Sequence, residues 1–228
     1  VGEKHGVMLK VDVVSENNDV NQFANQIEQA NETLGKKCDT ACADSGYANT
    51  EQLKQIDEQD IKVIVPSQRQ ASKKEPEEFD KERFKYKSRK DCYICPEGHK
   101  LIYKGGDGKN KRYNITKSSV CRKCNCFGKC TKSRHGRQIN RLVDEEIRAR
   151  LEAQYLQPES QAIYKLRKQK IELPFGHIKR NLGVKDFLLR GIDGVKAEMS
   201  VLATCFNVVR MISIFGVTGL IKELMPIK

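Results

Sequence analysis

The stretch from residue 38 to residue 66, CDTACADSGYANTEQLKQIDEQDIKVIVP, indicates the fold class. Residues 38–44 form a short segment that ends in Asp44, and residues 61–66 form an apolar run rich in β-branched side chains that ends at Pro66. The first predicts a short strand, and the second predicts a buried strand. Between them a Ser-Gly-Tyr turn is followed by Asn49, which predicts the N-cap of a helix that ends near residue 58. This alternation of strand and helix predicts an α/β fold.

Strand and helix patterns continue on both sides of this stretch. Residues 7–14 alternate in polarity and predict a strand, and residues 20–34 predict an amphipathic helix that stops at Gly35. Residues 67–90 are dense in Lys, Glu, Gln and Ser and predict a linker or exposed loop. Further strands are expected at 100–103 and 112–115, and further helices at 138–154, 160–170, 175–181 and 195–214, with a break at Pro174 and Gly176.

The most apolar stretch of the chain runs from Ala197 to Leu220. It carries Glu198 at its start and Arg210 in its middle, which favours a buried helix over a membrane span. No basic segment followed by an apolar run opens the chain, so nothing indicates secretion. We therefore expect no membrane partner and a cytoplasmic protein.

Charge is distributed unevenly along the 228 residues, whose formal net charge is +12. Residues 1–60 hold 5 Lys and Arg and 12 Asp and Glu, a net of −7, whereas residues 61–228 hold 37 and 18, a net of +19. A strongly basic segment favours polyanionic partners, because neutralised phosphates release their condensed counterions. Nucleic acid is the expected partner, with a solvated basic surface as the alternative.

Six of the nine cysteines lie close together in the sequence, at Cys92, Cys95, Cys121, Cys124, Cys126 and Cys130. Two Cys-x2-Cys knuckles about 25 residues apart are typical of a zinc ribbon, because this spacing lets both sulfurs of a knuckle reach one tetrahedral ion. Disulfides, free thiols or an iron–sulfur cluster are alternatives. Six thiols compete for four positions, so spacing alone leaves the ligand set open.

Two carboxylates are candidates for chemistry. Asp44 ends a predicted strand, and Glu172 lies beside a basic helix that bears aromatic residues. Carboxylates placed in this way can share divalent cations that activate a water or 3′-hydroxyl against a phosphodiester. Taken alone, however, Asp44 could simply form a turn and Glu172 could simply pair with Lys168.

Longer motifs carry a family resemblance. The run ACADSGYANTEQL at residues 41–53 resembles the second-aspartate segment of DDE-type insertion-sequence transposases, whose members have Asp-x-Gly-Tyr there. The run IYKLRKQKIELPFGHIKRNLG at residues 163–183 resembles their terminal glutamate segment, in which Tyr164, Arg167, Glu172 and Lys179 match a Tyr-Arg-Glu-Lys signature. Arg167 and Glu172 are separated by one residue more than is commonest in the family. A subgroup with a cysteine-rich insert matches YICPEGHKL and CRKCNCFGKCT as well.

The resemblance implies a fold, a metal site and a reaction. The implied fold is ribonuclease-H-like, a mixed sheet flanked by helices, with a cysteine-rich, zinc-ribbon-like insert. The implied reaction is Mg²⁺-dependent DNA cleavage and strand transfer, with Asp44 and Glu172 as catalytic residues. Tyr164, Arg167, Lys179 and Arg180 are the implied DNA-binding residues. The cysteines that align are Cys95, Cys121, Cys124 and Cys130, and these are the expected structural Zn²⁺ ligands.

By the same resemblance the first catalytic aspartate has no counterpart in the chain. Residues 1–14 resemble the hairpin that follows the first strand in the family, so that strand and its aspartate would lie upstream of Val1. Two carboxylates hold two Mg²⁺ ions poorly, because each ion needs several oxygen ligands. We therefore expect the chain to be an N-terminally incomplete transposase that is inactive alone.

The expected organisation has three parts: residues 1–66 and 138–228 as the two portions of the catalytic domain, and residues 67–137 as linker and insert. Because the family works in multimeric complexes, the resemblance also implies a homo-oligomer or complementation by a full-length transposase. A bacterial, nucleoid-associated location is implied. The alternatives are a non-enzymatic zinc-ribbon protein that binds nucleic acid, and a decayed relic without function.

Overall fold

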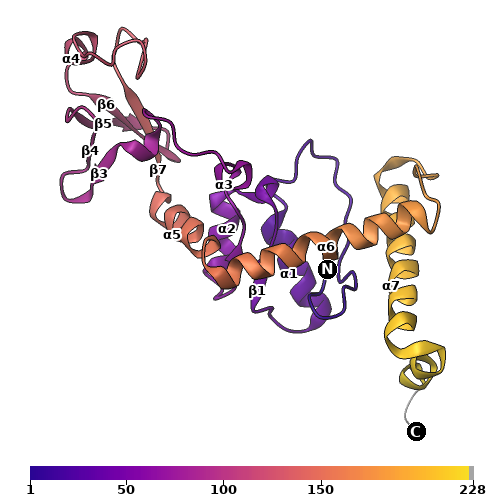
Figure 1. Cartoon of the computed structure of the whole chain (residues 1–228). Helices are drawn as coiled ribbons and strands as arrows, with labels where there is room; N and C mark the ends of the chain where they lie inside the picture. The colour runs from indigo at the N-terminus through magenta and orange to yellow at the C-terminus, as the bar shows by residue number, and fades with distance from the viewer. Residues whose placement is uncertain (226–228) are drawn as a thin grey trace. The chain divides into compact units, whose positions relative to one another are not determined.

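A computed structural model describes residues 1–225 (Figure 1). The chain divides into two units, and the predicted mixed α/β character is confirmed. The first unit contains residues 1–71 and 150–228, and the second contains residues 72–149, so the second is inserted into the first. We describe each unit by itself.

The core of the first unit is a pair of parallel strands, β1 (Thr40–Cys42) and β2 (Lys62–Ile64), joined through helix α2 (Thr50–Asp57). Asn49 caps α2, since its side chain accepts a hydrogen bond from the Glu51 amide. Helix α1 (Phe23–Leu34) packs on α2 and ends at Gly35, whose left-handed backbone closes the C-cap. These elements lie where the sequence predicts them.

Two long helices complete this unit. Helix α6 (Pro158–Arg180) packs against β1 and contacts α7 (Gly191–Leu224). The predicted break at Pro174 is wrong, because α6 continues through it. Proline removes only one backbone hydrogen bond, and the Pro174 side chain is fully buried in the packed face of the helix.

The strand predicted at residues 7–14 is also wrong, because this segment has no regular secondary structure and belongs to no sheet. Its backbone instead pairs with a side chain: the Met8 amide donates to Asn207 Oδ1 at 2.7 Å, and Asn207 Nδ2 donates to the Met8 carbonyl at 2.8 Å. Met8 then packs with Ile178, Met199, Ala203 and Phe206 in a second small core. Burial against α6 and α7 thus takes the place of a sheet.

Helix α7 is not the buried helix that we expected from its composition. It is long and apolar enough to cross a membrane by length and composition alone, and 11% of its most apolar stretch is buried. The side chains of α7 that are buried are Met199, Ala203, Phe206 and Leu220. Gly216 adopts φ +71° within α7 and separates two helical segments there.

The second unit is a five-stranded antiparallel sheet in the order β3-β4-β5-β6-β7. Its strands are β3 (Lys85–Lys87), β4 (Cys92–Ile94), β5 (Lys100–Gly106), β6 (Asn110–Ile115) and β7 (Gln138–Leu142).

Strands β5 and β6 confirm the two strands predicted at residues 100–103 and 112–115. The expectation of a loop at 67–90 is wrong where α3 (Gln68–Ser72) and β3 form. The expected helix at 138–154 is wrong in its first part, where β7 forms before α5 (Glu145–Tyr155).

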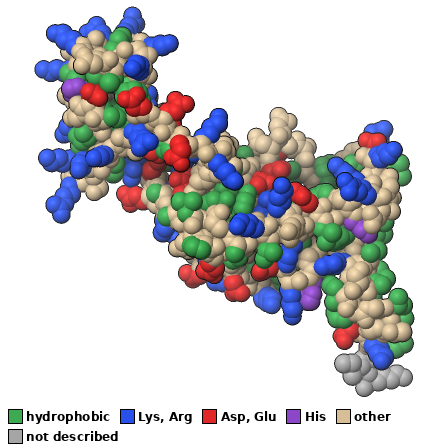
Figure 2. All heavy atoms as spheres, viewed as in Figure 1, with side chains coloured by type: hydrophobic (Ala, Val, Ile, Leu, Met, Phe, Trp, Pro, Cys, Tyr) green, Lys and Arg blue, Asp and Glu red, His purple; other side chains and the backbone are tan. Residues whose placement is uncertain are grey.

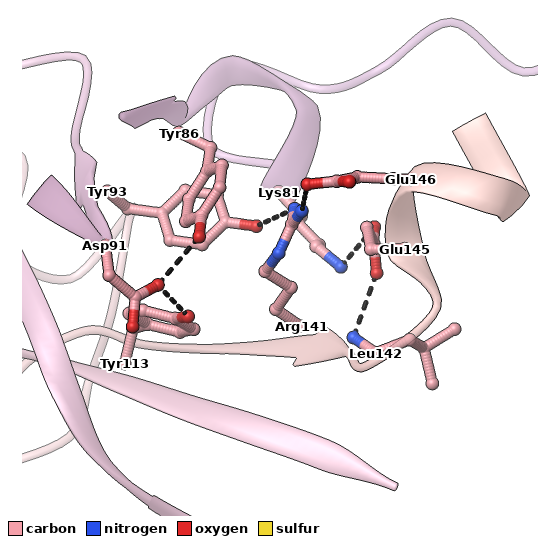
Figure 3. Close-up of polar contacts among 9 residues, drawn as sticks. All are labelled: Lys81, Tyr86, Asp91, Tyr93, Tyr113, Arg141, Leu142, Glu145 and Glu146. Carbon is pink, nitrogen blue, oxygen red and sulfur yellow. Dashed lines mark hydrogen bonds and ion pairs between the residues drawn. The ribbon is translucent and has the colours of Figure 1, made fainter. Parts of the chain in front are cut away.

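One face of this sheet, with helix α4 (Ser118–Arg122), encloses the core of the insert. The buried members are Phe84, Tyr93, Leu101, Tyr113, Ile115, Cys121 and Ile139. A polar network continues across the same face (Figure 3): Tyr86 and Tyr113 both donate hydroxyl hydrogen bonds to Asp91, at 2.7 and 2.6 Å. The Arg141 guanidinium lies over the Tyr86 ring, 3.9 Å from its centroid.

Candidate functional site

Asp44 lies just beyond the end of β1, where the sequence predicts it. Its backbone is extended, and its Oδ1 accepts a hydrogen bond from the Gly46 amide at 2.9 Å, which begins the short helical turn Ser45–Tyr47. A Cβ on residue 46 would lie 2.9 Å from Asp44 Oδ1, so glycine permits this approach. The carboxylate is therefore fixed by its own turn, with 49% of the side chain exposed.

Helix α6 brings Arg167 to Asp44 across 123 residues of sequence. Arg167 Nη2 donates to Asp44 Oδ2 at 2.9 Å, and the arginine side chain is only 15% exposed. The guanidinium also lies over the Tyr164 ring, 5.7 Å from its centroid, and Tyr164 packs edge-on against Tyr155. Two residues predicted to bind DNA thus form a supported cationic group beside Asp44.

Glu172 has a different environment from Asp44. It lies on α6 five residues after Arg167, which corresponds to a rotation of about 140° around the helix and a rise of about 7.5 Å. Its side chain is 69% exposed, and its ionic partner is Lys168 at 3.9 Å. The two carboxylates are therefore engaged by different cations of the same helix.

These residues do not fit a divalent-metal centre as arranged. Both oxygens of Asp44 are occupied by groups of the chain itself. Among residues 1–225, three metal-ligating side chains come within 4.8 Å of one another at Glu97, Cys124 and Cys126, and not around Asp44. A Mg²⁺ site built from Asp44 and Glu172 would require Arg167 to release Asp44 and further oxygen ligands to be supplied.

Lys179 and Arg180 lie in the last turn of α6, and both side chains are exposed. Cations at this position also interact favourably with the partial negative charge of the helix C-terminus. Their place in the fold leaves them accessible to a polyanion.

The cysteine cluster forms a second candidate site, within the insert. A pocket of about 20 Å³ is lined by the sulfur-bearing residues Cys95, Cys121, Cys124, Cys126 and Cys130. This volume is close to what one water molecule or one metal ion occupies. Cys92 is the sixth clustered cysteine. It lies on β4, where its neighbours across the sheet are Lys87 and Ile102.

Backbone amides are directed at three of the sulfurs. His99 N donates to Cys95 Sγ at 3.2 Å, Arg137 N to Cys121 Sγ at 3.4 Å, and Cys126 N to Cys124 Sγ at 3.5 Å. Such N–H donors favour the thiolate form that a metal ion requires. The donor set and the amides fit a zinc ion. Coordination would draw the sulfurs to within about 4 Å of one another, because each Zn–S bond is about 2.3 Å long.

Arg137 is a residue of this pocket that the sequence analysis missed. Its guanidinium donates to the carbonyls of Cys130 at 2.9 Å and Phe79 at 2.7 Å, and it lies 5.2 Å from the Phe84 ring centroid. Burial raises the pKa of the Cys130 thiol, and the positive charge of Arg137 opposes that effect. Gly136, directly before Arg137, was the only sequence signal for this part of the pocket. Its φ is +81°, and a Cβ at this position would lie 2.5 Å from Ile115 Cγ2, so a glycine is needed there.

A family model described as the transposase DDE domain matches residues 94–212, slightly more than half of the chain. The chain belongs to the DDE transposase family. The matched part of this transposase contains the pocket cysteines, Arg167 and Glu172, whereas Asp44 precedes it. Comparison with curated proteins and with solved structures gave no match.

Proposed function

We propose that this chain is a DNA-acting part of a DDE transposase that does not cleave DNA by itself. The family match to residues 94–212 is the observation that carries the transposase assignment. It favours an element-mobilising protein over a non-enzymatic zinc-ribbon protein. The reaction of such enzymes is phosphodiester hydrolysis followed by transfer of the new 3′ end, and DNA is the partner.

The residues at the end of β1 have assignable roles in this proposal. Asp44 and Glu172 are the catalytic carboxylates, and Arg167 positions Asp44 through the 2.9 Å ion pair. Arg167, Lys179 and Arg180 bind the phosphate backbone. The ring of Tyr164 supports Arg167 through a cation–π contact, at 5.7 Å from the ring centroid to the guanidinium. The chain is inactive alone because no other carboxylate comes close enough to Asp44 to share a metal ion with it among residues 1–225.

A nicking assay on supercoiled DNA tests this assignment. We expect no relaxed product from the purified chain with either Mg²⁺ or Mn²⁺. Glu172→Ala is compared with Glu159→Ala, which removes a carboxylate from the same helix where it pairs with Lys62 at 3.0 Å. A metal-dependent nick that needs Glu172 and not Glu159 would overturn the proposed inactivity and establish the catalytic role of Glu172.

We further propose that Cys95, Cys121, Cys124 and Cys130 hold one structural Zn²⁺. All four line the same pocket, and Cys126 lines it as well. Serine variants of all six clustered cysteines distinguish the sets when bound zinc per chain is measured by mass spectrometry. We expect the four proposed ligand variants to lose zinc, and Cys92→Ser and Cys126→Ser to keep one ion per chain. Retention of zinc in Cys95→Ser with loss in Cys126→Ser would show that the ligand set is wrong.

A further inference from the structure

The positive charge of the chain is concentrated in the insert. Residues 85–141 contain 17 Lys and Arg and 3 Asp and Glu, a net of +14, whereas the whole chain carries +12. The rest of the chain therefore has slightly more acidic than basic residues. Figure 2 shows blue side chains projecting around the part of the insert labelled β3 to β6 in Figure 1. This concentration of charge attracts polyanions.

The strand register divides the insert sheet into two faces. Tyr86 pairs with Tyr93, Tyr93 with Leu101, and Tyr113 with Ile139, so these side chains share the inner face and build the core. The alternate residues form the opposite face, which we call the outer face. Its members are Lys85, Lys87, Cys92, Ile94, Lys100, Ile102, Gly105, Asn110, Arg112, Asn114, Gln138, Asn140 and Leu142.

The outer face is basic and rich in amides, and it is exposed except around Cys92 and the Asn114 oxygen, which are buried. Six of its members are exposed, namely Lys85, Lys87, Lys100, Arg112, Gln138 and Asn140. None of its members is acidic. Gln138 Nε2 donates to Asn140 Oδ1 at 3.1 Å, which confirms that these two amides lie side by side. Asn114 Oδ1 is buried and has no hydrogen-bond partner in the described part of the chain.

We propose that the outer face of the insert sheet binds double-stranded DNA. The proposal extends the transposase function, since it names a surface outside the catalytic carboxylates. The Lys and Arg side chains contact phosphates across one groove. The exposed amides of Gln138 and Asn140 lie on β7, beyond Arg112, where they can form hydrogen bonds with the sugar-phosphate backbone or with base edges of the adjoining groove.

The dimensions of the sheet suit a duplex. The outermost cations lie on β3 and β6, three strand intervals apart, which is about 14 Å at about 4.8 Å per interval. The major groove of DNA is about 12 Å wide. Lys85 and Lys87 on one side, and Arg112 on the other, are therefore spaced to contact phosphates across one groove while β4 and β5 lie between them. An acidic protein would match the charge but would not require the amides.

The test is a salt titration of DNA affinity with the zinc-loaded 228-residue chain and no added magnesium. A fluorescent DNA duplex is followed by anisotropy between about 50 and 200 mM salt. The triple variant Lys85→Gln/Lys87→Gln/Arg112→Gln removes the three outer-face cations that are spaced to contact phosphates. We expect at least a tenfold loss of affinity at fixed salt. The slope of log affinity against log salt should fall by about 2.7, or about 0.9 per lost phosphate contact.

A matched control is Lys117→Gln/Lys123→Gln/Lys129→Gln, which removes the same charge from exposed positions in and beside the cysteine loops. We expect this variant to lose less than half as much slope. Equal weakening by both triples would overturn the proposal, because affinity would then follow total charge and not the outer face. Tighter binding of an RNA duplex, or no duplex binding by the unaltered chain, would also overturn it. Glu172→Ala should bind like the unaltered chain, so this result is independent of the nicking assay.

Discussion

At the scale of single residues, Arg167 determines the environment of the end of β1. It pairs with Asp44 and lies near the Cys42 thiol, whose pKa burial raises to about 11 while the positive charge of Arg167 lowers it. A group whose pKa is higher in the folded than in the unfolded chain favours folding at low pH. This contribution of Cys42 is therefore complete below pH 9 and is lost between about pH 9 and pH 11.

Cys42 should resist alkylation at pH 8. A thiol with a pKa near 11 is almost entirely protonated there, and the thiolate is the reactive form. Iodoacetamide labelling followed by peptide mass spectrometry measures its rate beside that of Cys205, which is exposed. We expect Cys42 to react at least tenfold more slowly than Cys205. Equal rates would show that burial does not protect Cys42.

Asp91 is the second residue whose replacement has a defined consequence. Hydrogen bonds from Tyr113 and then Tyr86 lower the pKa of its carboxyl group, so its stabilising contribution is present above about pH 4 and is lost in acid. Asp91→Asn keeps a residue that tolerates the observed φ of 39° but removes the negative charge from Oδ1, the one oxygen that accepts both tyrosine hydrogen bonds, and so weakens both bonds. We expect a loss of about 2 kcal/mol at pH 7 in urea unfolding of the zinc-loaded chain. Asp107→Asn in the exposed hairpin turn is the control and should cost much less.

At the scale of elements, the N-terminal segment at residues 7–14, which joins no sheet, depends on one side chain of α7. Asn207 supplies both hydrogen bonds to Met8 that a neighbouring strand would otherwise supply. Asn207→Ala should free this segment from α7, because the backbone groups of Met8 then form hydrogen bonds with water. Trypsin should therefore cut after Lys4 and Lys10 several-fold faster. Thr204→Ala removes an exposed side chain from the same helix and should leave the rate unchanged. Unaltered cleavage in Asn207→Ala would mean that apolar packing of Met8 suffices.

Elements formed by local signals were predictable from the sequence, and elements formed by distant pairing were not. The Asn49 cap and the Gly35 stop define α2 and α1 locally. In contrast, residues 138–142 contain only Ile139 as a buried side chain, and they become a strand because β6 pairs with them. The position of Asp44 at a strand end was predictable. Its ion pair with Arg167 was not, because 123 residues separate the two in sequence and only the packing of α6 on β1 brings them together.

At the scale of the whole molecule, the two units are stabilised in different ways. The first has apolar cores formed by residues from both of its chain segments, among them Ile56, Ile64 and Leu151. The second has one small core, seven buried residues against which Cys95 and Cys130 pack. Small domains of this kind commonly need a metal to fold. If zinc is bound by the cysteine pocket, its free energy of binding contributes directly to folding of the insert alone.

Removal of zinc should therefore separate the stabilities of the two units. Hydrogen-exchange mass spectrometry is the suitable measurement, because it reports both units peptide by peptide in a chain that lacks tryptophan. With a chelator, peptides from β4 to β7 should exchange at unfolded rates, whereas peptides from β1, β2 and α2 should keep their protection. Cys121→Ser should reproduce the pattern without chelator, since Cys121 is buried and its sulfur accepts from Arg137 N. Loss of protection in β1 and β2 as well would show that the units fold as one, because the first unit would then depend on zinc that none of its residues binds.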